Sequence, residues 1–140
     1  MDDIKEIQDA IVDEFSMYDD WMQKYEYIID LGKDLPLIDE KYKTDEYLIK
    51  GCQSRVWLYA EKVGEKVVFT ADSDAIITKG IISLLIRVMS HQLPEDIVNA
   101  ELYFIDKIGL KEHLSPTRSN GLLSMVKQIK MYALALMAKS

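Results

Sequence analysis

Hydrophobic residues at the start of the chain recur at every third or fourth position. Over the first eighteen residues this spacing predicts an amphipathic helix with one face turned to the core. Asp19 and Asp20 interrupt the pattern and suit an N-terminal cap, and the same periodicity then predicts a second helix over Trp21–Leu31. Gly32 fits the position just beyond that helix. The first pattern is carried by Ile4, Ile7, Ile11, Phe15 and Tyr18.

The pattern becomes alternating in the middle of the chain. Residues 33–47 are polar and have no period, so we expect a long connection that packs across the surface. Residues 54–60 alternate and predict a β-strand, residues 61–65 a hairpin turn around Gly64, and residues 67–69 the return strand. One face of the first strand carries Val56, Leu58 and Ala60, and the other carries Trp57 and Tyr59.

The second half returns to helical spacing. Ser73 or Asp74 is expected to cap a long helix from about Ala75 to Met89, which is apolar nearly all round and therefore central and buried. Pro94 predicts the start of a short helix, and residues 102–105 a further strand or extended edge. A C-terminal helix is predicted from the spacing of Leu122, Met125, Val126, Ile129, Tyr132, Ala133 and Leu136.

These elements predict one α+β domain over residues 1–140, in which a small antiparallel sheet packs against several helices. A chain of 140 residues can bury about two-thirds of its unfolded surface. Apolar residues make up 49% and charged residues 29%, as in an ordinary globular protein. The longest apolar runs, 81–86 and 131–138, are too short to cross a bilayer, and no secretory leader is recognisable.

The net charge of −7 is unevenly distributed. Residues 1–30 hold ten acids and two bases, a balance of −8, whereas the rest of the chain holds fourteen acids and fifteen bases. We interpret the acidic start as a solvated helix face, with docking to a partner as the alternative. A protein that binds nucleic acid needs a basic face to neutralise phosphates, and the sequence offers none.

Cys52 is the only cysteine of the chain, and it follows Gly51 in a loop that leads into the first strand. A single thiol excludes an internal disulfide and fits a reducing compartment, so we expect the cytoplasm. Free cysteines are usually buried and behave as small hydrophobes, so a structural role is the first reading of Cys52. Gln53 and Ser54 are suited either to donating hydrogen bonds to a sulfur anion or to shaping the turn.

Two other polar segments stand out. Asp72, Ser73 and Asp74 form a step between the return strand and the central helix, and capping explains most of it. Arg118 lies in the run Ser115–Gly121, at the start of the last helix. A cation there opposes the helix dipole at a cost of a few tenths to about 1 kcal/mol. We therefore expect Arg118 to contact a carboxylate, either on this chain or on a partner.

Four segments of the chain form a pattern when taken together: Lys24–Gly32, Ile49–Trp57, Asp72–Ala75 with Lys79 and Gly80, and His113–Ser119 with Gly121 and Leu122. In this order they resemble the SufE family of sulfur acceptors, and the run Gly-Cys-Gln-Ser-x-Val-Trp is the most specific of the four. The resemblance extends from about Trp21 to the last helix, and the first eighteen residues of the chain match only as a helix.

The resemblance implies a stoichiometric carrier that is not itself an enzyme. Cys52 accepts persulfide sulfur from a PLP-dependent cysteine desulfurase, stimulates it, and carries the sulfur to an iron–sulfur scaffold complex. The carrier needs no cofactor, and its thiol is held under apolar side chains until docking moves the loop about Gly51. A homodimer is left open. The residues assigned to partner binding are Arg118, Asp72, Asp74, Gln53 and Ser54.

Three alternatives stay open at this point. A paralogous acceptor would serve a different desulfurase and another sulfur pathway, such as RNA modification. A cysteine hydrolase would pair Cys52 as nucleophile with His113 as base. A non-catalytic binding module would not need the thiol at all. A zinc or iron site is disfavoured because His91 and His113 stand apart, without ligand spacing around either.

Overall fold

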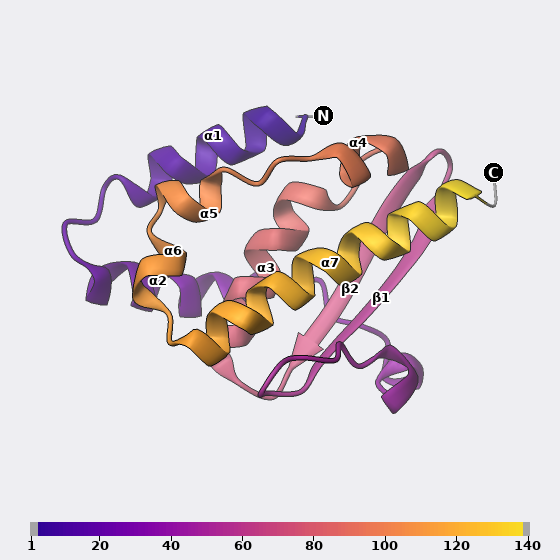
Figure 1. Cartoon of the computed structure of the whole chain (residues 1–140), viewed down its shortest axis with the longest axis horizontal. Helices are drawn as coiled ribbons and strands as arrows, with labels where there is room; N and C mark the ends of the chain where they lie inside the picture. Colours follow the sequence, from indigo (N-terminus) through magenta and orange to yellow (C-terminus); the bar gives the residue numbers. More distant parts are fainter. Residues whose placement is uncertain (1–2, 139–140) are drawn as a thin grey trace.

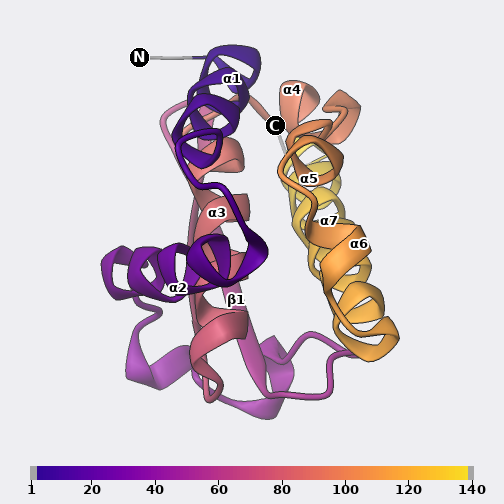
Figure 2. The same ribbon diagram turned by 90° about the vertical axis from the view of Figure 1, so that its left-hand side faces the viewer.

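The computed structural model describes residues 3–138 and has the α+β architecture expected from the sequence (Figure 1). Figure 2 shows the helices in two groups, with α1, α2 and α3 on one side and α4 to α7 on the other. The helices are α1 (Ile4–Phe15), α2 (Trp21–Leu31), α3 (Ile76–Met89), α4 (Pro94–Asn99), α5 (Phe104–Lys107), α6 (Leu110–His113) and α7 (Pro116–Ala138). The two strands are β1 (Val56–Val63) and β2 (Lys66–Ser73). Three short 3₁₀ turns are Gly32–Asp34, Glu40–Tyr42 and Asp45–Tyr47. Within the described residues, no helix has both the length and the apolar character needed to cross a membrane.

The sheet is an antiparallel hairpin whose register runs from Val56 opposite Ser73 to Val63 opposite Lys66. Both strands are longer than expected, because residues 61–63 still pair and the turn is only Gly64 and Glu65. Val56, Leu58 and Ala60 are buried, as expected for the core face of β1, but the second face is also covered. Trp57 is 9% exposed there, and Tyr59 stacks on Tyr42 with ring centroids 4.0 Å apart.

The connection over residues 33–47 packs across the sheet rather than hanging free. Leu35 and Ile38 are buried, although the segment has no hydrophobic period that marks them in the sequence. The Ile38 N–H donates to the Ala71 carbonyl at 3.0 Å, and the Ala71 N–H donates to the Pro36 carbonyl at 3.0 Å. These bonds tie the connection to the free edge of β2.

Helix α3 is the centre of the core, and ten of its residues are buried. It contacts α1, α2, α7 and β2. Its Gly80 lies where α2 crosses, and a methyl group at that position would overlap the carbonyl oxygen of Ile28 and lie 2.7 Å from its carbonyl carbon. Gly32 does follow α2, but in a right-handed conformation with φ −61°. A Cβ on Gly32 would lie 3.0 Å from the Gly80 nitrogen, so close approach of α3 accounts for this glycine.

One prediction in the last third was wrong. Residues 102–105 form no strand; α5 begins at Phe104, whose N–H donates to the buried Gln8 side chain at 3.2 Å. Gln8 also donates to the Glu101 carbonyl at 3.1 Å, so polar bonds across to α1 replace a strand ladder. The C-terminal helix is confirmed, and it begins at Pro116, inside the expected start segment Ser115–Gly121, because proline suits a first helical turn.

Glu14 joins the three N-terminal helices. Its carboxylate accepts hydrogen bonds from both Arg87 guanidinium nitrogens on α3 and from the Tyr27 hydroxyl on α2 at 2.6 Å. The Arg87 bond is the main cause that holds the pKa of the Glu14 carboxyl below its usual value. Burial, followed by the Glu14 hydrogen bond, raises the pKa of Tyr27 to about 12.

We expect Glu14→Gln to lower the free energy of unfolding by about 1–2 kcal/mol near neutral pH, since Arg87 is partly exposed. A carboxyl whose pKa is lower in the folded state stabilises the fold above its unfolded pKa, near 4.5. That stability is lost as the pH falls through the folded pKa, so the difference from wild type should shrink in acid. Urea unfolding of Glu14→Gln and wild type, at neutral pH and at a pH below the unfolded pKa, measures this difference in the free energy of unfolding. Asp30→Asn is the control, because the Asp30–Lys33 pair is exposed and should contribute almost nothing. A difference between Glu14→Gln and wild type that does not change with pH would contradict this account.

Candidate functional site

The Cys52 loop comprises residues 50–55, and backbone hydrogen bonds anchor it at both ends. Before the loop, the Ile49 N–H donates to the Val56 carbonyl at 2.8 Å, and Leu48 bridges to Trp57. At the far end, the backbone N–H of Arg55 donates to the Asp74 carboxylate at 3.0 Å. In Figure 1 the segment that precedes β1 runs along the lower edge of the molecule toward the beginning of α7. The fold therefore holds the ends of this loop and leaves its middle to contact α7.

The thiol of Cys52 points at α7. Its Sγ lies 3.6 Å from the carbonyl oxygen of Gly121 and donates a weak hydrogen bond to it. The residue is half-buried, and this burial raises the pKa of the Cys52 thiol. A raised pKa means less thiolate at neutral pH, and the thiolate is the nucleophile. In this closed position the sulfur is therefore held in its less reactive form.

Gly51 gives the loop its shape. Its φ is +94°, a conformation that side chains other than glycine adopt only with strain. A Cβ at Gly51 would also lie 2.5 Å from the Ser124 hydroxyl of α7. The residue expected to act as a hinge thus lies where the loop comes close to α7.

A small cavity of about 50 Å³ lies beside the thiol. Gln53 and Ser54 border it from the loop, which brings three of the expected site residues together with Arg118. Arg118 is the only Lys, Arg, Asp or Glu among the residues around it. The full lining is Cys52, Gln53, Ser54, Thr78, Ile81, Thr117, Arg118, Gly121 and Met125.

Arg118 occupies the first turn of α7, as expected, but its side chain meets no carboxylate within residues 3–138. Its Nη1 donates instead to the Tyr25 hydroxyl at 3.4 Å. Of the two contacts weighed from the sequence, the one to a carboxylate of this chain is therefore not found among the described residues. The guanidinium stays exposed at the edge of the cavity.

The Asp72–Asp74 step has two structural uses. The Asp72 carboxylate pairs with Lys43 at 2.9 Å and with Lys79 at 3.5 Å and is 16% exposed. Burial acts to raise the pKa of this carboxyl, but Lys43, the Ser73 N–H and Lys79 together hold it below its usual value. Asp72 therefore joins the long connection to α3 and is less accessible than Asp74, whose residue is exposed.

Neither Ser73 nor Asp74 caps α3, which corrects the expectation from the sequence. The N-cap is Ala75, and it makes no side-chain capping bond. Both polar side chains instead form hydrogen bonds with the backbone of Arg55. Asp74 accepts the Arg55 N–H, and the Ser73 hydroxyl donates to the Arg55 carbonyl at 2.8 Å. The step anchors the end of the Cys52 loop.

His113 gives no support to a cysteine hydrolase. Its ring stacks on Trp21 with centroids 4.5 Å apart, and its Nδ1 lies 2.9 Å from the Gly109 carbonyl oxygen. The hydrogen bond of Cys52 goes to Gly121, so the thiol and the imidazole are not paired. In the described part of the chain, no three His, Cys, Asp or Glu side chains gather in a way that could hold a metal ion.

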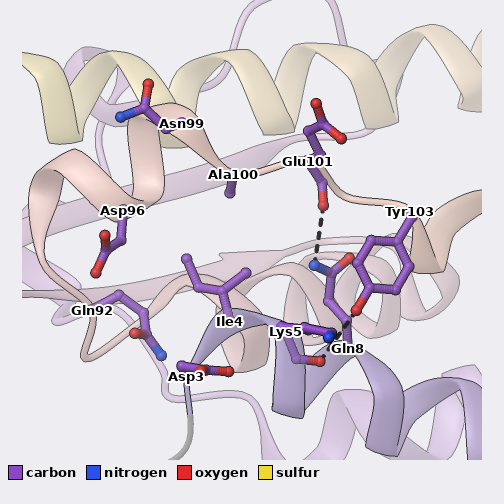
Figure 3. Close-up of a pocket in the computed structure, with 10 residues that line it drawn as sticks. All are labelled: Asp3, Ile4, Lys5, Gln8, Gln92, Asp96, Asn99, Ala100, Glu101 and Tyr103. Carbon is purple, nitrogen blue, oxygen red and sulfur yellow. Dashed lines mark hydrogen bonds between the residues drawn. The ribbon is translucent and has the colours of Figure 1, made fainter.

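A larger cavity of about 500 Å³ lies between α1 and the segment joining α4 to α5 (Figure 3). Its side chains are engaged in holding these elements together. Gln8 donates to the Glu101 carbonyl, and the Tyr103 hydroxyl donates to Asp9 at 2.7 Å. No cysteine or histidine borders it. We interpret this cavity as a gap between packed elements and not as a binding site.

Sequence reasoning missed the part of the site that α3 and α7 supply. Thr78 and Ile81 come from α3, and Gly121, Ser124 and Met125 come from α7. Gly121 was the one detectable signal, since a glycine inside a helical period often marks a close approach. A Cβ there would lie 3.6 Å from the Cys52 sulfur, in ordinary contact.

Comparison with known proteins places these features in a family. The SufE model, described as an Fe–S metabolism associated domain, matches residues 9–133. An uncharacterised SufE-like protein of Rhizobium meliloti is 39% identical over 127 residues, covering 87% of this chain and 91% of the relative. One of Rhizobium etli is 41% identical over 127 residues, covering 87% and 86%. The solution structure of a hypothetical protein from Thermus thermophilus has a TM-score of 0.78 at 16% identity over 94% of this chain and 96% of that one, which supports the fold alone. The chain belongs to the SufE family.

Proposed function

We propose that this protein is a sulfur acceptor that takes persulfide sulfur from a PLP-dependent cysteine desulfurase onto Cys52. It then delivers the sulfur to the machinery that assembles iron–sulfur clusters. Membership of a family described by Fe–S metabolism supports the general role. The observation that carries the proposal is the position of the thiol, which lies in an anchored loop with its sulfur turned inward beside a small cavity.

The transfer is a thiol exchange that needs no external oxidant or reductant. The Cys52 thiolate attacks the outer sulfur of the donor persulfide, a new S–S bond forms at Cys52, and the donor cysteine leaves as a thiolate. Cys52 then carries a persulfide, and in a second exchange of the same kind an acceptor thiolate takes its outer sulfur while Cys52 leaves as a thiolate. With no second cysteine in the chain, the persulfide has no internal thiol to attack it. The protein acts stoichiometrically, as a carrier and not as an enzyme.

The closed loop supports a carrier more than a hydrolytic catalyst. A half-buried thiol with a raised pKa is protected from oxidation while it waits for its partner. Docking must therefore turn the loop outward before sulfur can be exchanged. Gly51 is the residue whose backbone permits that rotation, since its neighbours hold both ends of the loop.

Four residues around the loop are suited to meet the desulfurase. Arg118 is an exposed cation at the cavity, Asp74 is an exposed carboxylate at the end of the loop, and Gln53 and Ser54 follow the thiol directly. Exposed charges of this kind chiefly set the encounter rate and the orientation of two partners. We assign Asp72 to internal anchoring, because its carboxylate is paired with Lys43 and Lys79.

Mass spectrometry after incubation with a cysteine desulfurase and free cysteine tests this function. We expect the Cys52 peptide to gain the mass of one or more sulfur atoms, and desulfurase turnover to rise when the protein is added. Cys52→Ser should abolish both effects. His113→Ala is the matched control and should retain them, because its ring contacts Trp21 and Gly109 and not the thiol. If no desulfurase, including those of paralogous sulfur pathways, transfers sulfur to wild-type Cys52, the proposal is wrong.

A further inference from the structure

The cavity beside Cys52 is bordered by a threonine whose hydroxyl the fold does not use. Thr78 lies on α3, is 6% exposed and borders the cavity together with the thiol. Its hydroxyl makes no hydrogen bond to any of residues 3–138. Other buried polar side chains are bonded: Gln8 donates to Glu101, and Ser90 accepts the Phe69 N–H at 2.9 Å. The Thr78 hydroxyl is therefore available to a group placed in the cavity.

The Thr78 oxygen is not sealed inside the fold. Every fully enclosed side-chain oxygen or nitrogen within residues 3–138 has a hydrogen-bond partner, so the unpaired Thr78 oxygen is not fully enclosed. The cavity that Thr78 borders is where its hydroxyl could meet a hydrogen-bond partner. Ile81 and Met125 form apolar walls of the same cavity. Its volume of about 50 Å³ exceeds the roughly 10–15 Å³ that one water molecule needs. There is room for one further atom the size of sulfur.

We propose that Thr78 is the hydrogen-bond donor to the outer sulfur of the Cys52 persulfide when the loop is closed. This inference rests on the proposed function. After transfer, the outer sulfur carries the negative charge and is one bond longer from the backbone than the thiol sulfur. The cavity beside Sγ is where it fits, and a hydroxyl that has no other partner is free to donate to it. Arg118 at the edge adds a positive charge on the same side.

The hydroxyl should act on the lifetime of the persulfide and not on its formation, because the sulfur is received with the loop open. We expect Thr78→Val to accept sulfur at the wild-type rate and to lose it to cyanide about three to ten times faster, the factor that one ordinary hydrogen bond supplies. Valine keeps the branched shape of threonine, and no internal hydrogen bond is removed, so the melting temperature should not change. Thr78→Ser restores the hydroxyl and should restore most of the lifetime.

The experiment loads each variant in two ways, with a desulfurase plus cysteine and with inorganic polysulfide, and follows the Cys52 persulfide by mass spectrometry. Thr117→Val is the matched control, because Thr117 also borders the cavity but is exposed. Equal lifetimes for Thr78→Val, Thr117→Val and wild type would overturn the inference. Should Thr78→Val prove unstable, Thr78→Ala gives the same comparison, and a lifetime equal to that of Thr78→Ser would equally overturn it. If the desulfurase fails to load wild type, the proposed function fails, whereas the polysulfide arm still decides the role of Thr78.

Discussion

Gly80→Ala should destabilise the protein by about 3 kcal/mol or more and lower its melting temperature by roughly 10 °C. The added methyl group would overlap the carbonyl oxygen of Ile28 and lie 2.7 Å from its carbonyl carbon. Two of the obstructing atoms belong to the backbone of α2, so no side-chain rotation relieves the overlap. Helices α2 and α3 would have to separate, and α3 is the helix around which the core is built. Urea unfolding measures the loss.

Gly121→Ala is the matched control for this prediction. Gly121 is also a buried glycine inside a helix, but a Cβ there meets only Cys52 atoms at 3.6 Å or more. Because alanine favours the helical backbone, we expect no loss of stability, or a gain of up to about 1 kcal/mol. If the two variants unfold at the same urea concentration, close helix contact is not the reason for Gly80.

Gly51→Ala should expose Cys52. An alanine with φ near +94° costs about 1–2 kcal/mol, and its methyl group would lie 2.5 Å from the Ser124 hydroxyl. Since about 1.4 kcal/mol changes an equilibrium tenfold, we expect iodoacetamide to label Cys52 on the order of ten times faster than in wild type. Burial raises the thiol pKa in the closed loop, so opening the loop should also move the midpoint of the labelling pH profile down toward the ordinary cysteine value.

A second substitution separates the two causes of this effect. Ser124→Ala removes the obstructing hydroxyl, and the nearest remaining Ser124 atom would lie 3.4 Å from the new methyl group, in ordinary contact. The double variant Gly51→Ala with Ser124→Ala should therefore label at an intermediate rate, because only the backbone strain is left. A wild-type labelling rate in Gly51→Ala alone would mean that this glycine does not hold the loop closed.

The elements that the sequence predicted well are those whose own periodicity is strong. Helices α1 and α2 and the central α3 were found with correct types, because their apolar spacing reports burial of one face or of nearly the whole surface. The strand expected over residues 102–105 failed because a short apolar run has no length over which helix and strand differ. Gln8, 96 residues before Phe104 in the chain, decided that segment by accepting the Phe104 N–H.

The capping prediction failed for a related reason. Ser73 and Asp74 have the chemistry of an N-cap, and nothing local distinguishes capping from a bond to another segment. The fold brings the Arg55 backbone next to them through the β1–β2 register, and their side chains bind it instead. The same residues thus serve the loop that carries the thiol rather than the helix that follows them.

By itself the sequence determined the α+β class, the order of most elements, the presence of a single thiol and the resemblance in which Cys52 and Arg118 stand at matching places. These properties depend on residue type and on the spacing of nearby residues, and both can be read directly from the sequence. Only the tertiary structure decided that Cys52 turns toward the Gly121 carbonyl and that Thr78 borders its cavity. It also decided that Asp72 is paired inside the protein. Such contacts join residues distant in the chain, and they are fixed by how closely helices approach and which donors remain unpaired after packing.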